Sequence, residues 1–164
     1  MSQEFRTGIG YDSHRLEFGR RLVLGGLEIA FEKGLVGHSD GDIVLHALTD
    51  ALLGAAGLGD IGQYFPPGDE EWRGAESTIF LEHARKLLEV NSYRIVNVDV
   101  VIVIEKPKIL PHRDRMRLHI AKTLGIDMER VGLKAKTAEG LGAVGEGEAA
   151  EAHAVAVIAR EGPE

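Results

Sequence analysis

Large and small side chains alternate along residues 5–14, and this period of two predicts a β-strand. One face of the strand carries the larger side chains, which are Phe5, Thr7, Ile9 and Tyr11. The opposite face carries two glycines followed by two polar residues, which are Gly8, Gly10, Asp12 and His14. This second face is bare until it ends in a carboxylate and an imidazole that point the same way, as two metal ligands from one strand would.

The rest of the chain is predicted to alternate strands and helices. Residues 21–29 predict a strand with a bend or bulge at Gly25 and Gly26. Apolar residues recur at helical spacing over 42–56, and Ser39 or Asp40 is expected to cap this helix. A loop rich in glycine and proline follows over 57–68. The other predicted elements are helices over 77–90 and 111–124 and strands over 95–104, 132–137 and 152–160.

This order of elements predicts an α+β fold, with one mixed β-sheet and helices packed on one of its faces. Residues 1–164 are expected to form a single domain. The strand over 95–104 is almost continuous Val and Ile, which is typical of a strand in the interior of a sheet. The other face of the sheet is rather apolar, and a symmetric oligomer would cover it most simply.

Composition excludes several classes of function. A hydrophobic content of 44% and a charged content of 27% are globular values, and no membrane span is expected. The N-terminus lacks a basic and then apolar signal segment, so a cytoplasmic location is expected. With no cysteine, a metal site must use His, Asp, Glu or backbone oxygens. The net charge of −7 argues against nucleic acid as a partner.

A metal site is the chemical hypothesis that the first strand suggests. His46 lies on the helix over 42–56, and with Asp12 and His14 it would give three ligands and an open fourth position, as in catalytic zinc sites. Asp50 lies one helical turn further on and could orient the imidazole of His46. From these residues alone, a strand-end polar pair and a surface histidine are equally good interpretations.

Residues 38–42, His-Ser-Asp-Gly-Asp, come directly before the same helix. They lack the glutamate that would close a calcium-binding loop, so that interpretation is rejected. A helix cap with a tight turn is one interpretation. The other is that the helix N-terminus, the hydroxyl of Ser39 and the imidazole of His38 receive a phosphate, and the two are compatible.

Other motifs favour structural interpretations. Gly140-x-Gly142-x-x-Gly145 has the letters of a dinucleotide fingerprint, but too few residues follow it for the βαβ unit that such a site needs. Residues 134–139 have the composition of a charged strand exit, and residues 107–111 that of a rigid loop between two prolines.

Five motifs in sequence order resemble those of the 2-C-methyl-D-erythritol 2,4-cyclodiphosphate synthases of the non-mevalonate isoprenoid pathway. The resemblance spans almost the whole chain. The motifs are Gly-Tyr-Asp-Ser-His at 10–14, the segment 38–55, Leu-Gly-Asp-Ile-Gly-x-x-Phe-Pro at 58–66, Pro-Lys-Ile-Leu-Pro-His at 107–112 and Lys-Ala-Lys-Thr-x-Glu at 134–139.

The resemblance implies a homotrimer whose sheets face inward and whose active sites lie between neighbouring subunits. It implies zinc ligands at Asp12, His14 and His46. It also implies that Glu139 holds a second divalent ion, magnesium or manganese, against a diphosphate. His38 and Thr137 match positions that stabilise the transition state. Substrate contacts are expected from Asp12, His14, His38, Ser39, Asp60, Ile61, Gly62, Phe65, Lys108, Ile109, Leu110, Lys136, Thr137, Ala138 and Glu139.

The implied reaction is the cyclisation of 4-diphosphocytidyl-2-C-methyl-D-erythritol 2-phosphate, which releases CMP. The nucleophile and the electrophile are both anionic, so cations and hydroxyls that hold the phosphates in line would supply most of the catalysis. The sequence departs from well-known members at Ala143 and Glu146, where Phe and Arg are common. Since Glu146 would repel a diphosphate, none is expected on the trimer axis. Lys136 stands where a hydroxyl residue is common, and could add a phosphate contact.

Two alternative functions stay open at this point. One is a zinc-dependent phosphohydrolase that uses the same three ligands with a bound water. The other is a non-catalytic trimeric sensor of a small molecule, in which the metal is structural.

Overall fold

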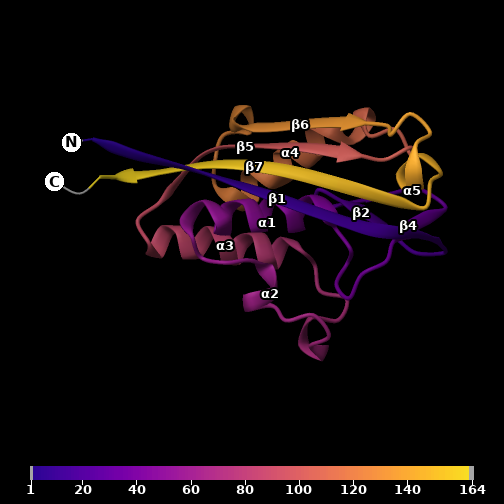
Figure 1. Ribbon diagram of the computed structural model, residues 1–164, viewed down its shortest axis with the longest axis horizontal. Coiled ribbons are helices and arrows are strands. Elements are labelled where there is room, and N and C mark those ends of the chain that lie inside the picture. The colour runs from indigo at the N-terminus through magenta and orange to yellow at the C-terminus, as the bar shows by residue number, and fades with distance from the viewer. Residues whose placement is uncertain (1, 163–164) are drawn as a thin grey trace.

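Strands β1 (Gln3–Phe18) and β7 (Ala149–Glu161) form a long antiparallel pair at the centre of a mixed five-stranded sheet. The computed structural model describes residues 2–162 (Figure 1). Strand β4 (Lys33–Leu35) pairs with the end of β1, and β5 (Arg94–Val103) pairs antiparallel with β7. Strand β6 (Val131–Lys136) runs parallel to β5. The predicted mixed sheet and the interior position of β5 are confirmed.

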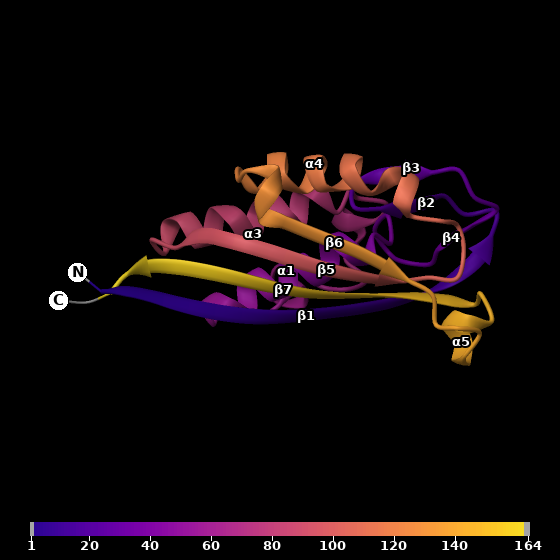
Figure 2. The same ribbon diagram turned by 90° about the horizontal axis from the view of Figure 1, so that it is seen from above.

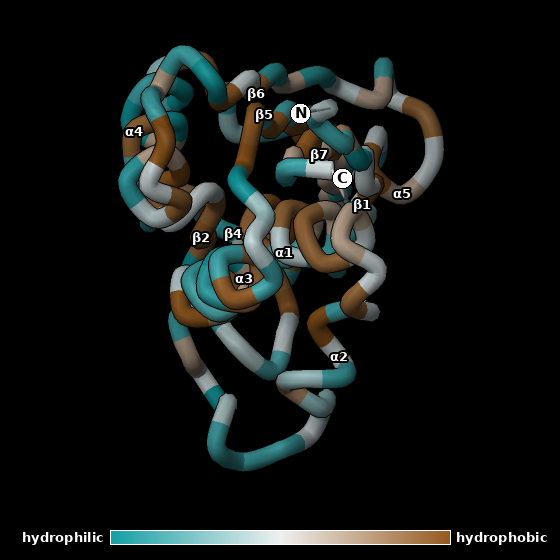
Figure 3. The backbone as a smooth tube through the Cα atoms, turned by 90° about the vertical axis from the view of Figure 1, so that its left-hand side faces the viewer, coloured by the Kyte–Doolittle hydropathy of each residue, from teal (hydrophilic) through white to brown (hydrophobic). Residues whose placement is uncertain are grey.

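The longer helices pack on one face of this sheet, as predicted (Figures 2 and 3). Within residues 2–162, no helix is both long and apolar enough to cross a membrane. The three longer helices are α1 (Ile43–Ala56), α3 (Thr78–Val90) and α4 (Arg113–Leu124). The shorter helical segments are α2 (Ile61–Tyr64), α5 (Gly142–Gly145) and 3-10 turns at Glu70–Trp72, Leu110–His112 and Met128–Arg130.

The prediction of one continuous strand over 21–29 is wrong, because the chain reverses direction within this segment. Strands β2 (Leu22–Leu24) and β3 (Leu27–Ile29) form a separate two-stranded sheet. Gly25 and Gly26 connect them with positive φ angles of 59° and 79°. Two successive residues with positive φ make the tight turn of a β-hairpin, which bulky residues adopt poorly. The two glycines therefore turn the chain rather than bend it.

Helix α1 packs directly against the bare face of β1. A Cβ atom added at Gly8 would lie 1.9 Å from the carbonyl oxygen of Ala51, and one at Gly10 would lie 1.8 Å from that of Ala47. Any side chain on these two positions would therefore push the helix away from the strand. The glycines let the two backbones approach closely enough for side chains at the end of β1 to reach α1.

The start of α1 is fixed by Asp42, which is fully buried. Its carboxylate accepts the N–H groups of Val44 and Leu45 at 3.1 Å each, so Asp42 is the cap of the helix. The predicted caps, Ser39 and Asp40, are wrong. The same carboxylate accepts the N–H groups of Gly25 and Gly26 at 3.0 and 2.7 Å. It therefore joins the β2–β3 turn to α1.

The face of the sheet away from the helices carries large apolar side chains that are exposed. Ile9 is 76% exposed, Phe5 57%, Tyr11 51% and Val155 46%. Neighbouring strands bring these side chains together, since Ile9 on β1 lies opposite Val155 on β7. The expectation of an apolar second face is confirmed, and such a patch is typical of an association surface.

Replacing Gly10 by alanine should separate α1 from β1, because the new methyl group would overlap the helix backbone. We expect Gly10→Ala to lower the free energy of unfolding in urea by about 3 kcal/mol. The control is Gly54→Ala, on the α1 side of the same contact, where the atom nearest a new Cβ is the Ile9 carbonyl oxygen at 4.0 Å. That variant should be unchanged or more stable by about 0.5–1 kcal/mol. Wild-type stability of the Gly10 variant would contradict the close contact.

Candidate metal and phosphate site

The ends of β1 and α1 bring Asp12, His14 and His46 together. The Asp12 Oδ2 atom lies 3.0 Å from His14 Nε2 and 2.9 Å from His46 Nδ1. The three ligand atoms lie within 4.8 Å of one another, and this is the cluster in residues 2–162 that could hold a metal ion. The period of two in β1 aims the first two groups at α1, and the glycine contacts below them bring His46 within reach.

The donor set fits a transition metal. Two imidazole nitrogens and one carboxylate oxygen suit Zn²⁺ and related ions, whereas Mg²⁺ and Ca²⁺ prefer oxygen ligands. The side chains of Asp12 and His14 are each 24% exposed, and that of His46 is 13% exposed. An ion held by these three atoms would therefore have an open side toward the cavity.

The cluster is strongly coupled electrostatically. Burial would by itself raise the pKa of Asp12, but hydrogen bonds and charge attraction from His14 and His46 outweigh it and lower this pKa to about 2. The hydrogen bond to Asp12 raises the pKa of His14 above 6.5, against the opposing effect of burial. Asp12 is therefore ionised at every physiological pH, and it favours a positive charge beside it.

The cluster lies at one end of a cavity of about 270 Å³. Many of the substrate-contact residues predicted from the sequence line it, namely Asp12, His14, His38, Ser39, Ile61, Gly62 and Phe65. Trp72 and Phe80 also line it and were not predicted. Their rings pack against Phe65, at centroid distances of 4.8 and 4.5 Å, and form an apolar wall. Asp60 instead accepts the N–H of Gln63 and caps α2.

Two of the amides at the N-terminus of α1 are not free to receive the phosphate that residues 38–42 suggested. The N–H groups of Val44 and Leu45, which would face an anion, are already bonded to Asp42. His38 and Ser39 do face the cavity, and His38 Nε2 lies 2.6 Å from the carbonyl oxygen of Asp69. Side chains rather than helix amides are therefore available here for a phosphate.

Asp50 does not orient His46, contrary to the expectation from their spacing. Its Oδ1 accepts the N–H of Ile61 at 2.8 Å and so holds the start of α2. The Nε2 atom of His46 faces two hydroxyls instead, Ser77 Oγ at 2.8 Å and Ser39 Oγ at 3.2 Å. Ser77 lies 31 residues after His46 in the sequence, so local spacing gives no signal for this contact.

The second group of predicted residues lines another cavity, of about 200 Å³, at the ends of β5 and β6. Its predicted members are Lys108, Ile109, Leu110, Lys136 and Thr137. Glu105 also lines it and was not predicted, and its Oε1 accepts the N–H of Ala138 at 2.5 Å. Glu139 is exposed, has a positive φ of 53°, and donates its N–H to Thr137 Oγ1 at 3.3 Å.

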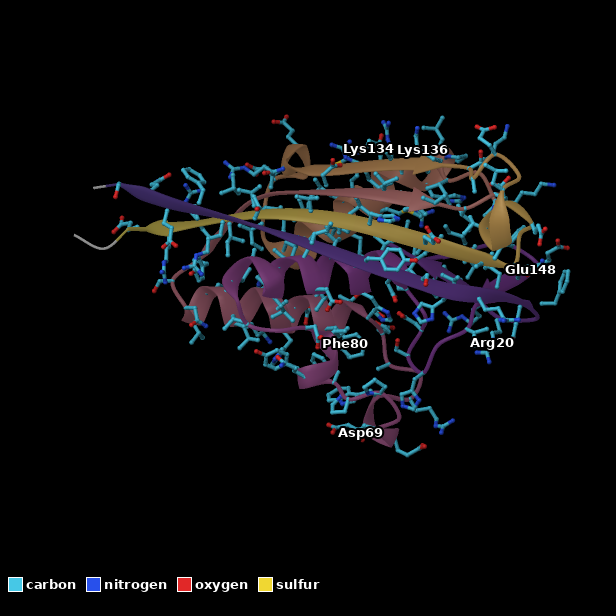
Figure 4. The ribbon with its side chains drawn as sticks, in the orientation of Figure 1. Arg20, Asp69, Phe80, Lys134, Lys136 and Glu148 are labelled. Carbon is cyan, nitrogen blue, oxygen red and sulfur yellow. The ribbon has the colours of Figure 1, made fainter. Side chains whose placement is uncertain are left out.

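The cavity beside the metal cluster and the cavity at the ends of β5 and β6 lie apart in one chain. Among the described residues, the two cavities share no lining side chain, and Glu139 lies outside the metal cluster. In Figure 4, Lys134 and Lys136 lie along β6 at the upper edge, whereas Phe80 and Asp69 lie below the sheet. The predicted site residues therefore fall into two separate groups within one chain.

Comparisons with known proteins identify the relatives of this chain. Residues 5–159 match the YgbB family. The 2-C-methyl-D-erythritol 2,4-cyclodiphosphate synthase of Dehalococcoides mccartyi is 56% identical over 153 residues, 93% of this chain and 98% of the relative. That of Chloroherpeton thalassium is 54% identical over 153 residues, with the same shares of 93% and 98%. A Plasmodium falciparum structure solved as a CDP complex has a TM-score of 0.86 at 36% identity, covering 99% of this chain and 100% of that one.

The chain belongs to the YgbB family.

Family membership confirms the resemblance that the five sequence motifs indicated. It also agrees with the α+β fold, because the matched structure covers the sheet and the helices together. The segment in which this chain departs from well-known family members forms α5 and its end. Ala143 lies in that helix and Glu146 is its C-terminal cap. Gly140 and Gly145 approach each other at this turn, so the fingerprint-like glycines have a structural role.

Metal binding should weaken as the pH falls, because the metal displaces a proton from His14. The pKa of His14 is raised by Asp12, so protonation begins to compete above pH 6.5. Below that range the apparent affinity should fall by up to about tenfold per pH unit. Asp12, with its pKa of about 2, stays ionised and adds nothing to the slope. Zinc titration against a competing chelator measures this, and a constant affinity from about pH 8 to about pH 5.5 would contradict it.

Proposed function

We propose that the chain converts 4-diphosphocytidyl-2-C-methyl-D-erythritol 2-phosphate to 2-C-methyl-D-erythritol 2,4-cyclodiphosphate and CMP. This is a lyase reaction of the non-mevalonate isoprenoid pathway. The observation that carries the proposal is the convergence of Asp12, His14 and His46 on a cavity lined by His38 and Ser39, in a chain of the YgbB family. The relatives at 54–56% identity are named as this synthase, which agrees with the enzyme predicted from the sequence.

The chemistry sets the requirements for the site. An oxygen of the 2-phosphate attacks the β-phosphorus, and the bond between that phosphorus and the CMP oxygen breaks. Both reacting groups are anionic, so the barrier consists mainly of charge repulsion and the entropy of ring closure. A phosphate oxygen is already nucleophilic, so the site needs positive charge and positioning groups more than a general base.

Asp12, His14 and His46 would hold zinc, and Glu139 would hold a second ion, magnesium or manganese. When bound, these ions stabilise negative charge on the phosphoryl oxygens as Lewis acids. His38 and Ser39 line the same cavity as the three zinc ligands. The Ser39 hydroxyl would donate a hydrogen bond to a phosphate there, and His38, whose Nε2–H faces the Asp69 carbonyl, would donate from Nδ1 in its doubly protonated form. The aromatic wall of Phe65, Trp72 and Phe80 limits the access of water. Excluding water favours cyclisation over hydrolysis.

The second cavity supplies the nucleotide half of the site. Lys108 and Lys136 provide positive charge beside it, and Thr137 provides a hydroxyl that we assign to transition-state stabilisation. Ile109, Leu110 and Ala138 add backbone and apolar contacts. A relative of known structure was solved as a CDP complex, which supports a cytidine diphosphate ligand here.

A homotrimer with the sheets facing inward would join the two halves. Two observations support it. The metal cavity and the nucleotide cavity are separate within one chain, and the sheet face that carries Ile9 and Val155 is apolar and exposed. Packing this face against copies of itself removes apolar surface from water. The single domain over 1–164, the cytoplasmic location and the lack of a diphosphate on the trimer axis stay predictions.

The products of the reaction test the proposed activity directly. Incubation with the cytidine diphosphate substrate and divalent ions should release CMP and the cyclic diphosphate, as seen by ³¹P NMR. Asp12→Ala should lower the rate by at least about 100-fold and leave the fold intact, because it removes a ligand rather than a core residue. CMP with a linear phosphate would instead indicate a hydrolase. Binding without turnover, or loss of fold in the variant, would indicate a sensor with a structural metal.

Mixing two inactive variants tests whether each site is shared between subunits. His38→Ala damages the metal half and Thr137→Ala damages the nucleotide half. After unfolding and refolding together in equal amounts, about one interface in four should combine two intact halves, giving about one quarter of wild-type activity. Each variant refolded alone is the control. Recovery no greater than the sum of the separate activities would place both halves in one chain.

A further inference from the structure

Ser77 is a fully buried polar residue that stands at the N-terminal cap of α3. Serine at this position usually accepts a hydrogen bond from its own helix. Here the hydroxyl is used differently, because it donates to Asp40 Oδ1 at 2.5 Å and lies 2.8 Å from His46 Nε2. The side chain thus joins a carboxylate to a ligand of the candidate metal site.

Asp40 holds Ser77 by two contacts. Its Oδ1 accepts the hydroxyl and its Oδ2 accepts the Ser77 N–H at 2.9 Å. The Oδ1 atom also accepts the N–H of Asp42 at 3.0 Å. The position of the serine hydroxyl is therefore fixed relative to the loop that precedes α1.

The chemistry of these groups fixes the direction of the hydrogen bonds. An ionised carboxylate only accepts, so the single hydroxyl proton of Ser77 points to Asp40. The lone pairs of the hydroxyl remain free to accept a hydrogen bond from the Nε2–H of His46. An imidazole that carries its proton on Nε2 has a bare Nδ1, and Nδ1 is the atom that faces Asp12 in the metal cluster.

We propose that Asp40 and Ser77 are positioning residues that hold His46 in the tautomer with a free Nδ1, ready to bind the metal. This inference rests on the metal site of the proposed function. Histidine ligands in metalloproteins generally donate their second ring N–H to a fixed acceptor, which orients the ring and raises its basicity. Asp12 acts in the opposite direction, because without a metal its carboxylate attracts a proton to Nδ1.

Two other residues are weaker candidates for this role. Asp50 lies on the same helix as His46, but its Oδ1 accepts the N–H of Ile61. Ser39 lies further from His46 Nε2, at 3.2 Å compared with 2.8 Å for Ser77. In addition, the hydroxyl of Ser77 is oriented by its hydrogen bond to Asp40.

Ser77→Ala is a clean test, because it removes the hydroxyl and keeps the backbone N–H that Asp40 accepts. We expect zinc affinity, measured by chelator competition, to fall roughly 10- to 100-fold. The matched control is the next residue, Thr78→Ala. Its hydroxyl also contacts an imidazole, His119 Nε2 at 2.9 Å, but His119 lies outside the metal cluster. The Thr78 variant should bind zinc like the wild type.

Proton NMR of the zinc-loaded chain gives a second measurement. The Nε2–H of His46 should give a resonance shifted downfield by its hydrogen bond, and Ser77→Ala and Asp40→Asn should each move or abolish it. Asp40→Asn also keeps the test valid if Ser77→Ala does not fold. Unchanged zinc affinity and an unmoved resonance, or an equal loss in Thr78→Ala, would overturn this inference alone. A wild-type chain that binds no zinc would overturn the metal site as well.

Discussion

The contact between the backbone of α1 and the bare face of β1 determines where the rest of the site lies. Gly8 and Gly10 leave no space for a side chain, so the helix rests on the strand itself. The next two positions on this face, Asp12 and His14, then extend past the contact toward His46. A pair of elements separated by an ordinary layer of side chains would hold these groups too far apart for one ion.

The aspartates near α1 explain how a chain with a net charge of −7 can offer a site to an anionic substrate. Asp42 is bonded to the β2–β3 turn, Asp50 to the start of α2, and Asp40 to the start of α3. Each carboxylate accepts backbone N–H groups, which offset its charge locally. Each also ties α1 or the loop before it to a different segment. The carboxylates near the cavity thus carry less unopposed negative charge than the composition suggests.

The sequence predicts those features of the site that depend on residues close together along the chain. The period of two in β1 and the helical spacing of α1 suggested that Asp12, His14 and His46 share one site, and the resemblance of the five motifs decided between this and the structural alternatives. Contacts between distant segments left no such signal. The cap at Asp42 depends on the approach of Gly25 and Gly26, and the partner of His46 is Ser77 rather than the helical neighbour Asp50. Short-range spacing could not distinguish these tertiary contacts from nearer alternatives.

The division of the site into two halves has a consequence for its energetics. The proposed metal half is preformed, because Asp12 Oδ2 lies 3.0 and 2.9 Å from the nitrogens of His14 and His46 within one chain. The cavity that we assign to the nucleotide lies separately at the ends of β5 and β6. In the proposed trimer, metal binding therefore depends on the fold of the subunit, whereas alignment of the two phosphates depends on the interface. Ring closure needs both, because the reacting phosphates must be brought together against their mutual repulsion. Weakening the apolar sheet face would consequently affect catalysis more than metal affinity.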